Sequence, residues 1–244
     1  MLVLMLASFT AGVEYVRGDV DLDGKVTVAD VTSLIDYLLK GTWDDGPQVD
    51  NHEWVNLGLP SGTLWATCNV GADNPEDYGD YFAWGETEPK SIYTFTTYKW
   101  CNGSYNTLTK YCTNSDLGTV DNKTELDPED DAAYVNWGPL WCMPSVDQIN
   151  ELLENCSREW TMLNDVSGWL ITGPNGNSMF LPSAGYRWDN YVADTGGICY
   201  YWTRTLFGDP TCAHVHYLTY DTWTWTILTR DYGLPVRAVR APQN

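Results

Sequence analysis

The chain has 244 residues, enough for one sizeable domain with a smaller appendage. Its 33 acidic and 13 basic residues give a formal net charge of −20 at pH 7, so repulsion disfavours nucleic acid and anionic lipid as partners. No stretch of about 20 apolar residues is present, which excludes a membrane-spanning helix within it. The 13 Trp and 16 Tyr have partly polar rings that suit ligand-facing surfaces as well as cores.

The sequence pattern of residues 1–17 predicts a truncated secretory signal segment. An apolar run from Met1 to Ala7 precedes small residues typical of a cleavage region, although the basic start of a signal is lacking. A short buried helix is the alternative. A signal predicts that the protein is secreted or held at the cell surface.

An acidic loop from Asp19 to Asp30 has the ligand spacing of a calcium loop. Acids occupy loop positions one, three, five and twelve, and a glycine occupies position six. The oxygen ligands expected for Ca2+ are those of Asp19, Asp21, Asp23, Lys25 through its carbonyl, Thr27 and Asp30. The alternative is a solvated acidic turn.

From the last positions of this loop onward, apolar residues recur at helical spacing, and Gly41 ends the run; they are Val28, Val31, Leu34, Ile35, Leu38 and Leu39. Loop and helix together, residues 18–41, resemble a single type I dockerin repeat, in which Asp is the usual twelfth residue. Dockerins carry two such repeats, so docking of this single repeat on a partner chain stays open. One helix cannot bury its own apolar stripe, which must pack elsewhere.

A polar segment with Gly and Pro at residues 42–52 predicts a linker, and residues 53–242 form the large domain. Its clearest element is a hairpin formed by Trp169–Thr172 and Ser178–Leu181, joined through Asn175-Gly176. Two short strands are predicted within residues 53–66, and others at residues 78–86, 200–206, 213–220, 223–228 and 236–239.

One helix is predicted from about Val146 to Cys156, with Ser145 and Gln148 as a capping box. Between Lys99 and Asp131 the chain is polar and irregular, which predicts a long loop. One or two helices beside many short antiparallel strands predict an α+β fold.

Several motifs of the large domain, among them Gly79-Asp80-Tyr81-Phe82-Ala83-Trp84-Gly85-Glu86, resemble the Fibrobacter succinogenes major paralogous domain. The others lie at residues 54–66, 143–145, 176–187, 200–203 and 236–240. That family comprises secreted or surface proteins of anaerobic bacteria, and its domain is similar to the C-type lectin and formylglycine-generating-enzyme fold. The resemblance implies a C-type lectin-like recognition domain over residues 53–242. It says less about function, because this fold hosts unrelated activities.

The seven cysteines form no Cys-x-x-Cys pair, so a structural zinc site is not expected. An odd number leaves at least one thiol outside any intrachain disulfide. The pairs closest in the chain are Cys101 with Cys112 and Cys199 with Cys212, and the latter spacing is too long for the copper-holding pair of formylglycine-generating enzymes. His214 and His216 share a strand face and could chelate a transition metal, but no third ligand is evident.

No sequence motif of nucleophilic, zinc-protease or phosphate-loop catalysis occurs, so we expect a protein that is not an enzyme. Glycoside hydrolysis by unrecognised acids stays an alternative, because 33 carboxylates make coincidental acid pairs inevitable.

The late strands predict an exposed aromatic surface instead. Trp223 and Trp225 share a strand face, and flat rings of this kind stack on sugars or anchor protein contacts. The residues expected at this ligand face are Trp188, Asn190, Tyr191, Tyr220, Trp223 and Trp225. Burial of one Trp face in the core is the alternative. The sequence thus predicts an adhesin or a carbohydrate- or protein-binding module; a scaffold component that docks through the dockerin-like repeat is the second hypothesis.

Overall fold

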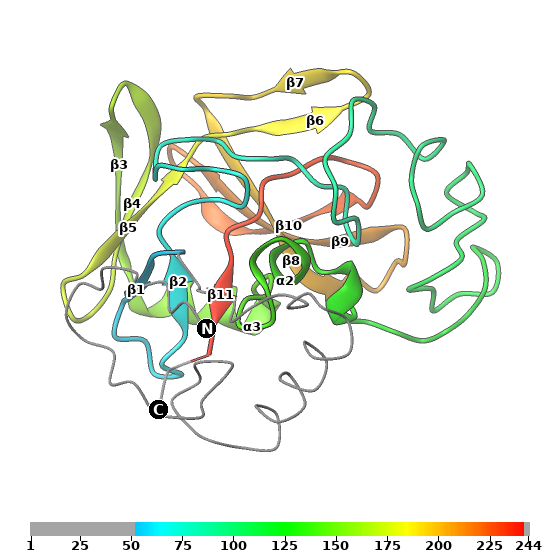
Figure 1. The fold of residues 1–244 in the computed structure, drawn as a ribbon, viewed down its shortest axis with the longest axis horizontal. Coiled ribbons are helices and arrows are strands. Elements are labelled where there is room, and N and C mark those ends of the chain that lie inside the picture. The colour runs from blue at the N-terminus through cyan, green and yellow to red at the C-terminus, as the bar shows by residue number, and fades with distance from the viewer. Residues whose placement is uncertain (1–51, 242–244) are drawn as a thin grey trace, which may run out of the picture. The chain divides into compact units, whose positions relative to one another are not determined.

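The computed structural model describes residues 52–241, which all belong to one compact unit (Figure 1). The helical elements of this part of the chain are η1 (Pro128–Asp130), α2 (Ala132–Trp137) and α3 (Val146–Asn155). Its strands are β1 (Trp54–Asn56), β2 (Leu64–Ala66), β3 (Ser157–Leu163), β4 (Val166–Thr172), β5 (Ser178–Pro182), β6 (Tyr186–Trp188), β7 (Tyr191–Ala193), β8 (Ile198–Leu206), β9 (Cys212–Thr219), β10 (Trp223–Thr229) and β11 (Val239–Arg240).

These strands form small sheets in which every pairing is antiparallel. Their orders are β1-β2-β11, β10-β9-β8, β3-β4-β5 and β6-β7. In the described residues the sheets are accompanied by two short α-helices, as an α+β chain requires.

The β10-β9-β8 sheet lies between two hydrophobic clusters. Neighbouring residues of a strand point to opposite faces, so Trp202 of β8 and Val215 of β9 enter one cluster, while Tyr201 and Leu218 enter the other. All four side chains are buried. Burial on both faces explains why β8 and β9 carry long apolar and aromatic runs.

The predicted helix and hairpin are confirmed. Ser145 accepts a hydrogen bond from the backbone N–H of Gln148, and the Gln148 side chain accepts one from the Ser145 N–H, so helix α3 begins with a capping box. Strands β4 and β5 pair around a turn in which Gly176 has a φ of 87°, a conformation that favours glycine.

The strand predicted at residues 78–86 is wrong. Only Phe82 pairs there, in an isolated bridge with Leu234, because Gly79 and Gly85 have positive φ angles of 70° and 78° that break an extended run. The last strand is also shorter than predicted. It comprises only Val239 and Arg240.

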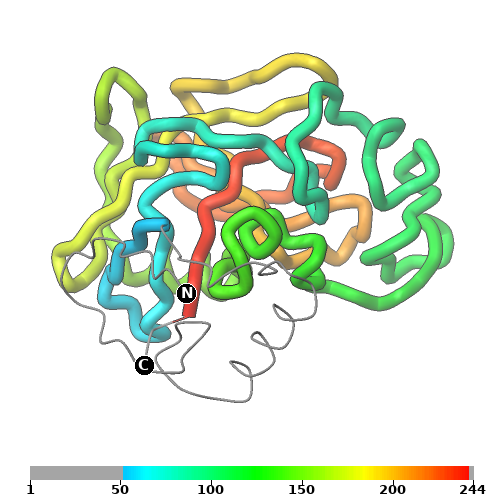
Figure 2. The backbone as a smooth tube through the Cα atoms, viewed as in Figure 1, coloured from blue at the N-terminus to red at the C-terminus, as the bar shows by residue number. Residues whose placement is uncertain are grey.

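The irregular segment predicted between Lys99 and Asp131 is confirmed up to the short η1 helix, and Figure 2 shows it as successive turns at one end of the domain. It nevertheless contributes to a small buried cluster that includes Leu108, Cys112 and Tyr98. Neither candidate cysteine pair forms a disulfide, and all seven cysteines are free thiols.

Two buried arginines join the end of the domain to distant segments. Arg237 donates to the side-chain oxygen of Asn69 and to the carbonyl oxygens of Ala66, Thr67 and Phe180, over 2.7 to 3.0 Å. Arg230 donates in the same way to the Tyr98 hydroxyl and to the carbonyl oxygens of Lys110, Tyr111 and Pro210. These hydrogen bonds solvate charges that burial would otherwise make unfavourable.

Candidate ligand-binding surface

The β6–β7 hairpin (Figure 1) carries two exposed aromatic residues of the predicted ligand face, Trp188 and Tyr191. It follows Gly185, whose φ is 63° and where a Cβ would lie 1.9 Å from the carbonyl oxygen of Ala193, so only glycine fits. On its other side β6 exchanges backbone hydrogen bonds with Gly233, and Asp189 exchanges two with Tyr93. Both edges of the strand are therefore held in place.

Six aromatic side chains continue from this hairpin across strands β8 and β9; we call them the aromatic row, and in order of contact they are Tyr191, Trp188, Tyr232, Tyr186, Tyr200 and Tyr217. Consecutive ring centroids are 5.5, 6.3, 5.4, 5.3 and 5.2 Å apart. Trp188 and Tyr191 are 41% and 43% exposed, and the other four rings are half-buried. The rings therefore support one another while each keeps accessible surface.

The tyrosine hydroxyls distinguish the row from the core. Within residues 52–241 no protein group hydrogen-bonds to the hydroxyls of the five row tyrosines, and none of these oxygens is a fully buried atom without a partner, so each is at least partly accessible. The buried tyrosines behave differently: Tyr98 donates to the carbonyl oxygen of Trp84 (2.6 Å) and Tyr201 to that of Pro182 (3.0 Å). The row thus offers donors and acceptors that the fold itself does not use.

The row is uncharged but has acidic neighbours. Burial raises the pKa of Tyr200 above its usual value, and Tyr217 and Asp194 raise it further, so this hydroxyl stays protonated. Asp189 and Asp194 are both exposed on the hairpin and the turn after it. Arg187, the basic residue of β6, points to the opposite side, over the rings of Tyr81 and Tyr93.

The structure divides the predicted ligand residues into separate groups. Trp188 and Tyr191 join the row, with the exposed Asn190 in the turn between them. Tyr217 pairs with Thr224, whereas Trp225 pairs with His216, so Trp225 and the row occupy opposite faces of the β10-β9-β8 sheet. The expectation that the hairpin residues lie beside the Trp223 and Trp225 face is therefore wrong.

The remaining predicted residues differ in exposure. Trp225 is 45% exposed and contacts the His214 ring at 5.1 Å, and Tyr220, in the β9–β10 turn, is 73% exposed. Trp223 is half-buried and packs beside Trp169, with the Arg158 guanidinium 4.7 Å from its ring centre.

Four residues of the row were missed by the sequence analysis: Tyr186, Tyr200, Tyr217 and Tyr232. Tyr200 and Tyr217 alternate with buried neighbours along β8 and β9, which is the signal that was available for these two. Their proximity depends on pairings between segments far apart in the chain.

The strand histidines do not form an open metal site. His214 and His216 share a face, as predicted, but Nε2 of the buried His216 accepts a hydrogen bond from Nε1 of Trp223 at 2.6 Å. Burial lowers the pKa of His216 to about 3, so the ring is neutral.

Within residues 52–241, one acidic group has ligand atoms close enough to hold a metal: Asp127, Glu129 and Asp130. Lys110 occupies this position, since its Nζ lies 2.6 Å from carboxylate oxygens of Asp127 and Asp130 and 3.6 Å from Glu129. Burial alone would lower the pKa of Lys110, but hydrogen bonds to Asp127 and Asp130 raise it above its usual value. The ammonium group therefore stands where a cation would bind, and the cluster is not diagnostic of calcium.

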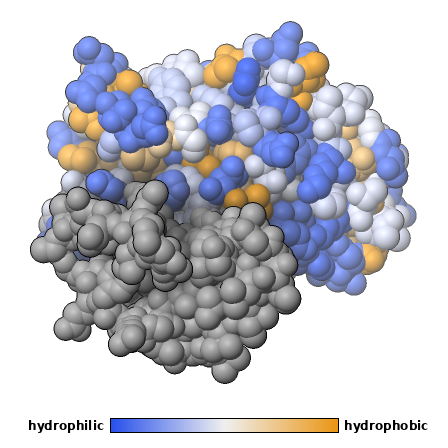
Figure 3. All heavy atoms as spheres, in the orientation of Figure 1, coloured by the Kyte–Doolittle hydropathy of each residue, from blue (hydrophilic) through white to orange (hydrophobic). Residues whose placement is uncertain are grey.

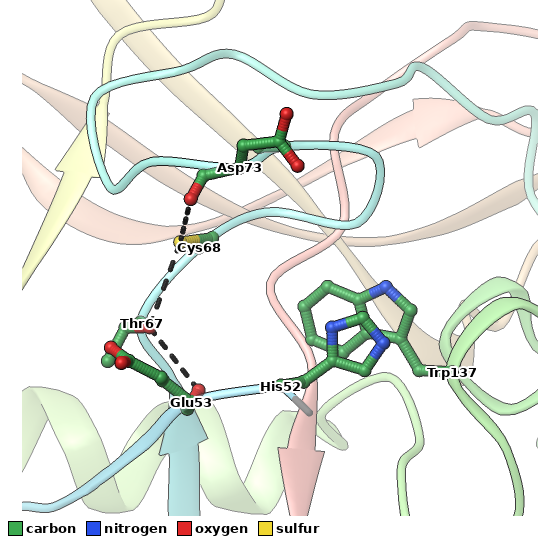
Figure 4. Close-up of a pocket in the computed structure, with 7 residues that line it drawn as sticks. His52, Glu53, Thr67, Cys68, Asp73 and Trp137 are labelled. Carbon is green, nitrogen blue, oxygen red and sulfur yellow. Dashed lines mark hydrogen bonds between the residues drawn. The ribbon is translucent and has the colours of Figure 1, made fainter. Parts of the chain in front are cut away.

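A polar pocket of about 380 Å³ lies near the start of the described chain, lined by His52, Glu53, Thr67, Cys68, Ala72, Asp73 and Trp137 (Figure 4). The His52 ring stacks on Trp137, with centroids 3.9 Å apart. The thiol of Cys68 donates to the carbonyl oxygen of Asp73 at 3.7 Å and lies 3.7 Å from the Thr67 hydroxyl.

The coloured part of Figure 3 shows hydrophobic residues only in small separate groups.

The predicted signal segment, the calcium ligands Asp19 to Asp30 and the dockerin-like helix lie outside the described residues. Comparison of the chain with protein-family models, curated proteins and solved structures gave no match. Among the helices of residues 52–241, none has the length and apolar character needed to cross a bilayer.

Proposed function

We propose that residues 53–242 form a non-enzymatic carbohydrate-recognition domain of a secreted or cell-surface protein, with the aromatic row as its ligand face. The observation that carries this proposal is the row itself, six contacting rings with five hydroxyls that no protein group of residues 52–241 uses. Ring faces stack against the C–H faces of sugars, and hydroxyl groups exchange hydrogen bonds with sugar hydroxyls.

The anchoring of the row supports binding without rearrangement. Strand β6 is bonded along both edges, and Tyr186 packs against the Tyr200 and Tyr232 rings, so little side-chain freedom is left to lose. Ordering a flexible side chain on binding costs about 0.5–1.5 kcal/mol, which a preorganised row avoids.

The proposal includes a C-type lectin-like fold of the kind found in the Fibrobacter succinogenes major paralogous domain. The motifs quoted from the sequence support it, and the antiparallel sheets with two short helices agree with the α+β class that the resemblance implies. We further propose that the loop from Asp19 to Asp30 binds Ca2+, on the support of its ligand spacing.

A glycan array with the full chain tests the function. We expect binding to at least one glycan, its loss in Trp188→Ala and Tyr191→Ala, and its retention in Trp225→Ala, which lies on the opposite sheet face. Binding lost only in Trp225→Ala would move the site to the other face. Absence of binding to any glycan, or glycoside turnover abolished by one Asp or Glu substitution, would contradict the proposal.

A further inference from the structure

We infer that the aromatic row takes an internal segment of an extended, uncharged polysaccharide rather than a terminal sugar; this inference rests on the proposed function. Tyr191 makes its ring contact in the row with Trp188 alone, and Tyr217 makes its contact with Tyr200 alone. The four rings between these ends succeed one another, so the surface is longer than one sugar ring is wide.

The shape of the surface favours a polysaccharide that lies along the row and continues beyond both of its ends. Two rings, Trp188 and Tyr191, project with more than two-fifths of their surface exposed, and the other four form a half-buried continuation. A site for a chain end needs a closed pocket with convergent polar groups, as small-molecule sites generally have. A pocket that includes His52 and Cys68 and another that includes Glu86 and Lys99 contain none of the six rings.

The acidic surroundings of the row favour uncharged over anionic polysaccharides. The exposed carboxylate of Asp194 lies near Tyr186 and Tyr200 of the row, while Arg187 lies against Tyr81 and Tyr93 on the other side of β6. Uronic-acid or sulfated chains would therefore meet like charge at this carboxylate. An uncharged chain meets only ring faces and hydroxyls.

Several weak contacts in series have a measurable consequence. Each additional sugar that reaches another ring adds favourable free energy, and every 1.4 kcal/mol corresponds to about tenfold in affinity. Affinity should therefore rise with oligosaccharide length until the row is covered.

The test is calorimetry of the full chain with β-1,4-linked gluco-, manno- and xylo-oligosaccharides of two to six units, and with polygalacturonate as the anionic probe. For at least one series we expect affinity to rise more than about tenfold from the disaccharide to the hexasaccharide, with weaker or no binding of polygalacturonate. Tyr191→Ala should lower the hexasaccharide affinity, and Tyr220→Ala, an exposed tyrosine outside the row, should not.

Equal affinity for the disaccharide and the hexasaccharide, or tighter binding of polygalacturonate, would overturn the inference and leave carbohydrate recognition intact. Failure of every glycan on the array and in calorimetry would instead overturn the proposed function. Thermal unfolding of both variants within a degree or two of the parent establishes that a lost affinity reflects the surface and not the fold.

Discussion

The indole N–H of Trp223 donates to Nε2 of His216 across 2.6 Å, inside the hydrophobic cluster on one face of the β10-β9-β8 sheet. Because Nε2 accepts, the proton of the neutral imidazole resides on Nδ1. A protonated His216 would lose this hydrogen bond in a buried site, which links the integrity of the sheet to acidity.

We expect His216 to make the domain sensitive to acid. The pKa of an unfolded histidine is about 6.5, and burial lowers that of His216 to about 3, so its contribution is complete above pH 6.5 and declines as the pH falls towards 3. At pH 4 the loss is on the order of 3 kcal/mol. Urea unfolding at pH 7 and pH 4 measures this difference in the free energy of unfolding. The variant His216→Gln retains an acceptor for Trp223 but cannot be protonated in this range, so its stability should depend less on pH. An unchanged pH dependence in that variant would contradict the assignment.

Removal of single hydroxyl groups should separate ligand binding from stability. Tyr200→Phe deletes a hydroxyl that the fold does not use, so we expect stability within about 0.5 kcal/mol of the parent and glycan affinity reduced about three- to tenfold. Tyr201→Phe deletes the donor to the Pro182 carbonyl and should cost about 1–2 kcal/mol of stability without changing affinity. Calorimetry measures the glycan affinity of both variants, and urea unfolding measures their stability. A loss of affinity in Tyr201→Phe but not in Tyr200→Phe would place Tyr201 and not Tyr200 at the ligand.

Asp131 should not tolerate an isosteric amide. Its Oδ1 accepts from the backbone N–H groups of Ala133 and Tyr134, and its Oδ2 accepts from that of Met143 at 2.8 Å. In Asp131→Asn one of these N–H groups would face the amide NH2, so we expect a loss of about 1–3 kcal/mol. The exposed Asp116→Asn is the matched control. Equal stability of the two variants in urea would show that the cap at α2 contributes little.

Arg237 should be among the least replaceable residues. Arg237→Met fills similar space but leaves three carbonyl groups and the Asn69 amide oxygen without their donor, so we expect a loss of at least about 3 kcal/mol or failure to fold. Arg158→Met, an exposed guanidinium over the Trp223 ring, should cost less than about 1 kcal/mol. Thermal unfolding measures both, and similar losses would contradict the importance of the buried hydrogen bonds.

Calcium binding is predicted to need the acids of the Asp19–Asp30 loop. Titration of Ca2+ into chelator-treated full chain should show one saturable site, and Asp21→Ala with Asp23→Ala should abolish it. Asp36→Ala, which changes an acid outside the ligand positions, is the matched control. Calorimetric heats that do not change in the double variant would exclude this loop as the site.

Local signals in the sequence were sufficient for elements that close over a few residues. The Ser145–Gln148 capping box and the Asn175-Gly176 turn both depend on neighbouring side chains, and α3 and the β4–β5 hairpin form as predicted. The strand predicted at residues 78–86 does not form, and the cause is again local. Glycines with positive φ angles interrupt an aromatic stretch that otherwise suits a strand.

The candidate ligand face could be predicted only in part. Trp188 and Tyr191 were predicted because they lie in a loop flanked by glycines. Tyr200 and Tyr217 meet through the β8–β9 register, and Tyr232 contacts Tyr186 from the segment that follows β10. Such contacts arise from long-range pairing, which residue periodicity does not encode.

The hydrogen bonds of Arg237 and the pairing of β11 with β2 bring the last residues of the domain against some of its first, Leu64 to Asn69. During synthesis, β2 therefore stays incompletely paired until Val239 and Arg240 have left the ribosome. A chain truncated before Val239 would lack this closing strand, and such a product should be cleared by proteases rather than accumulate as a smaller working domain.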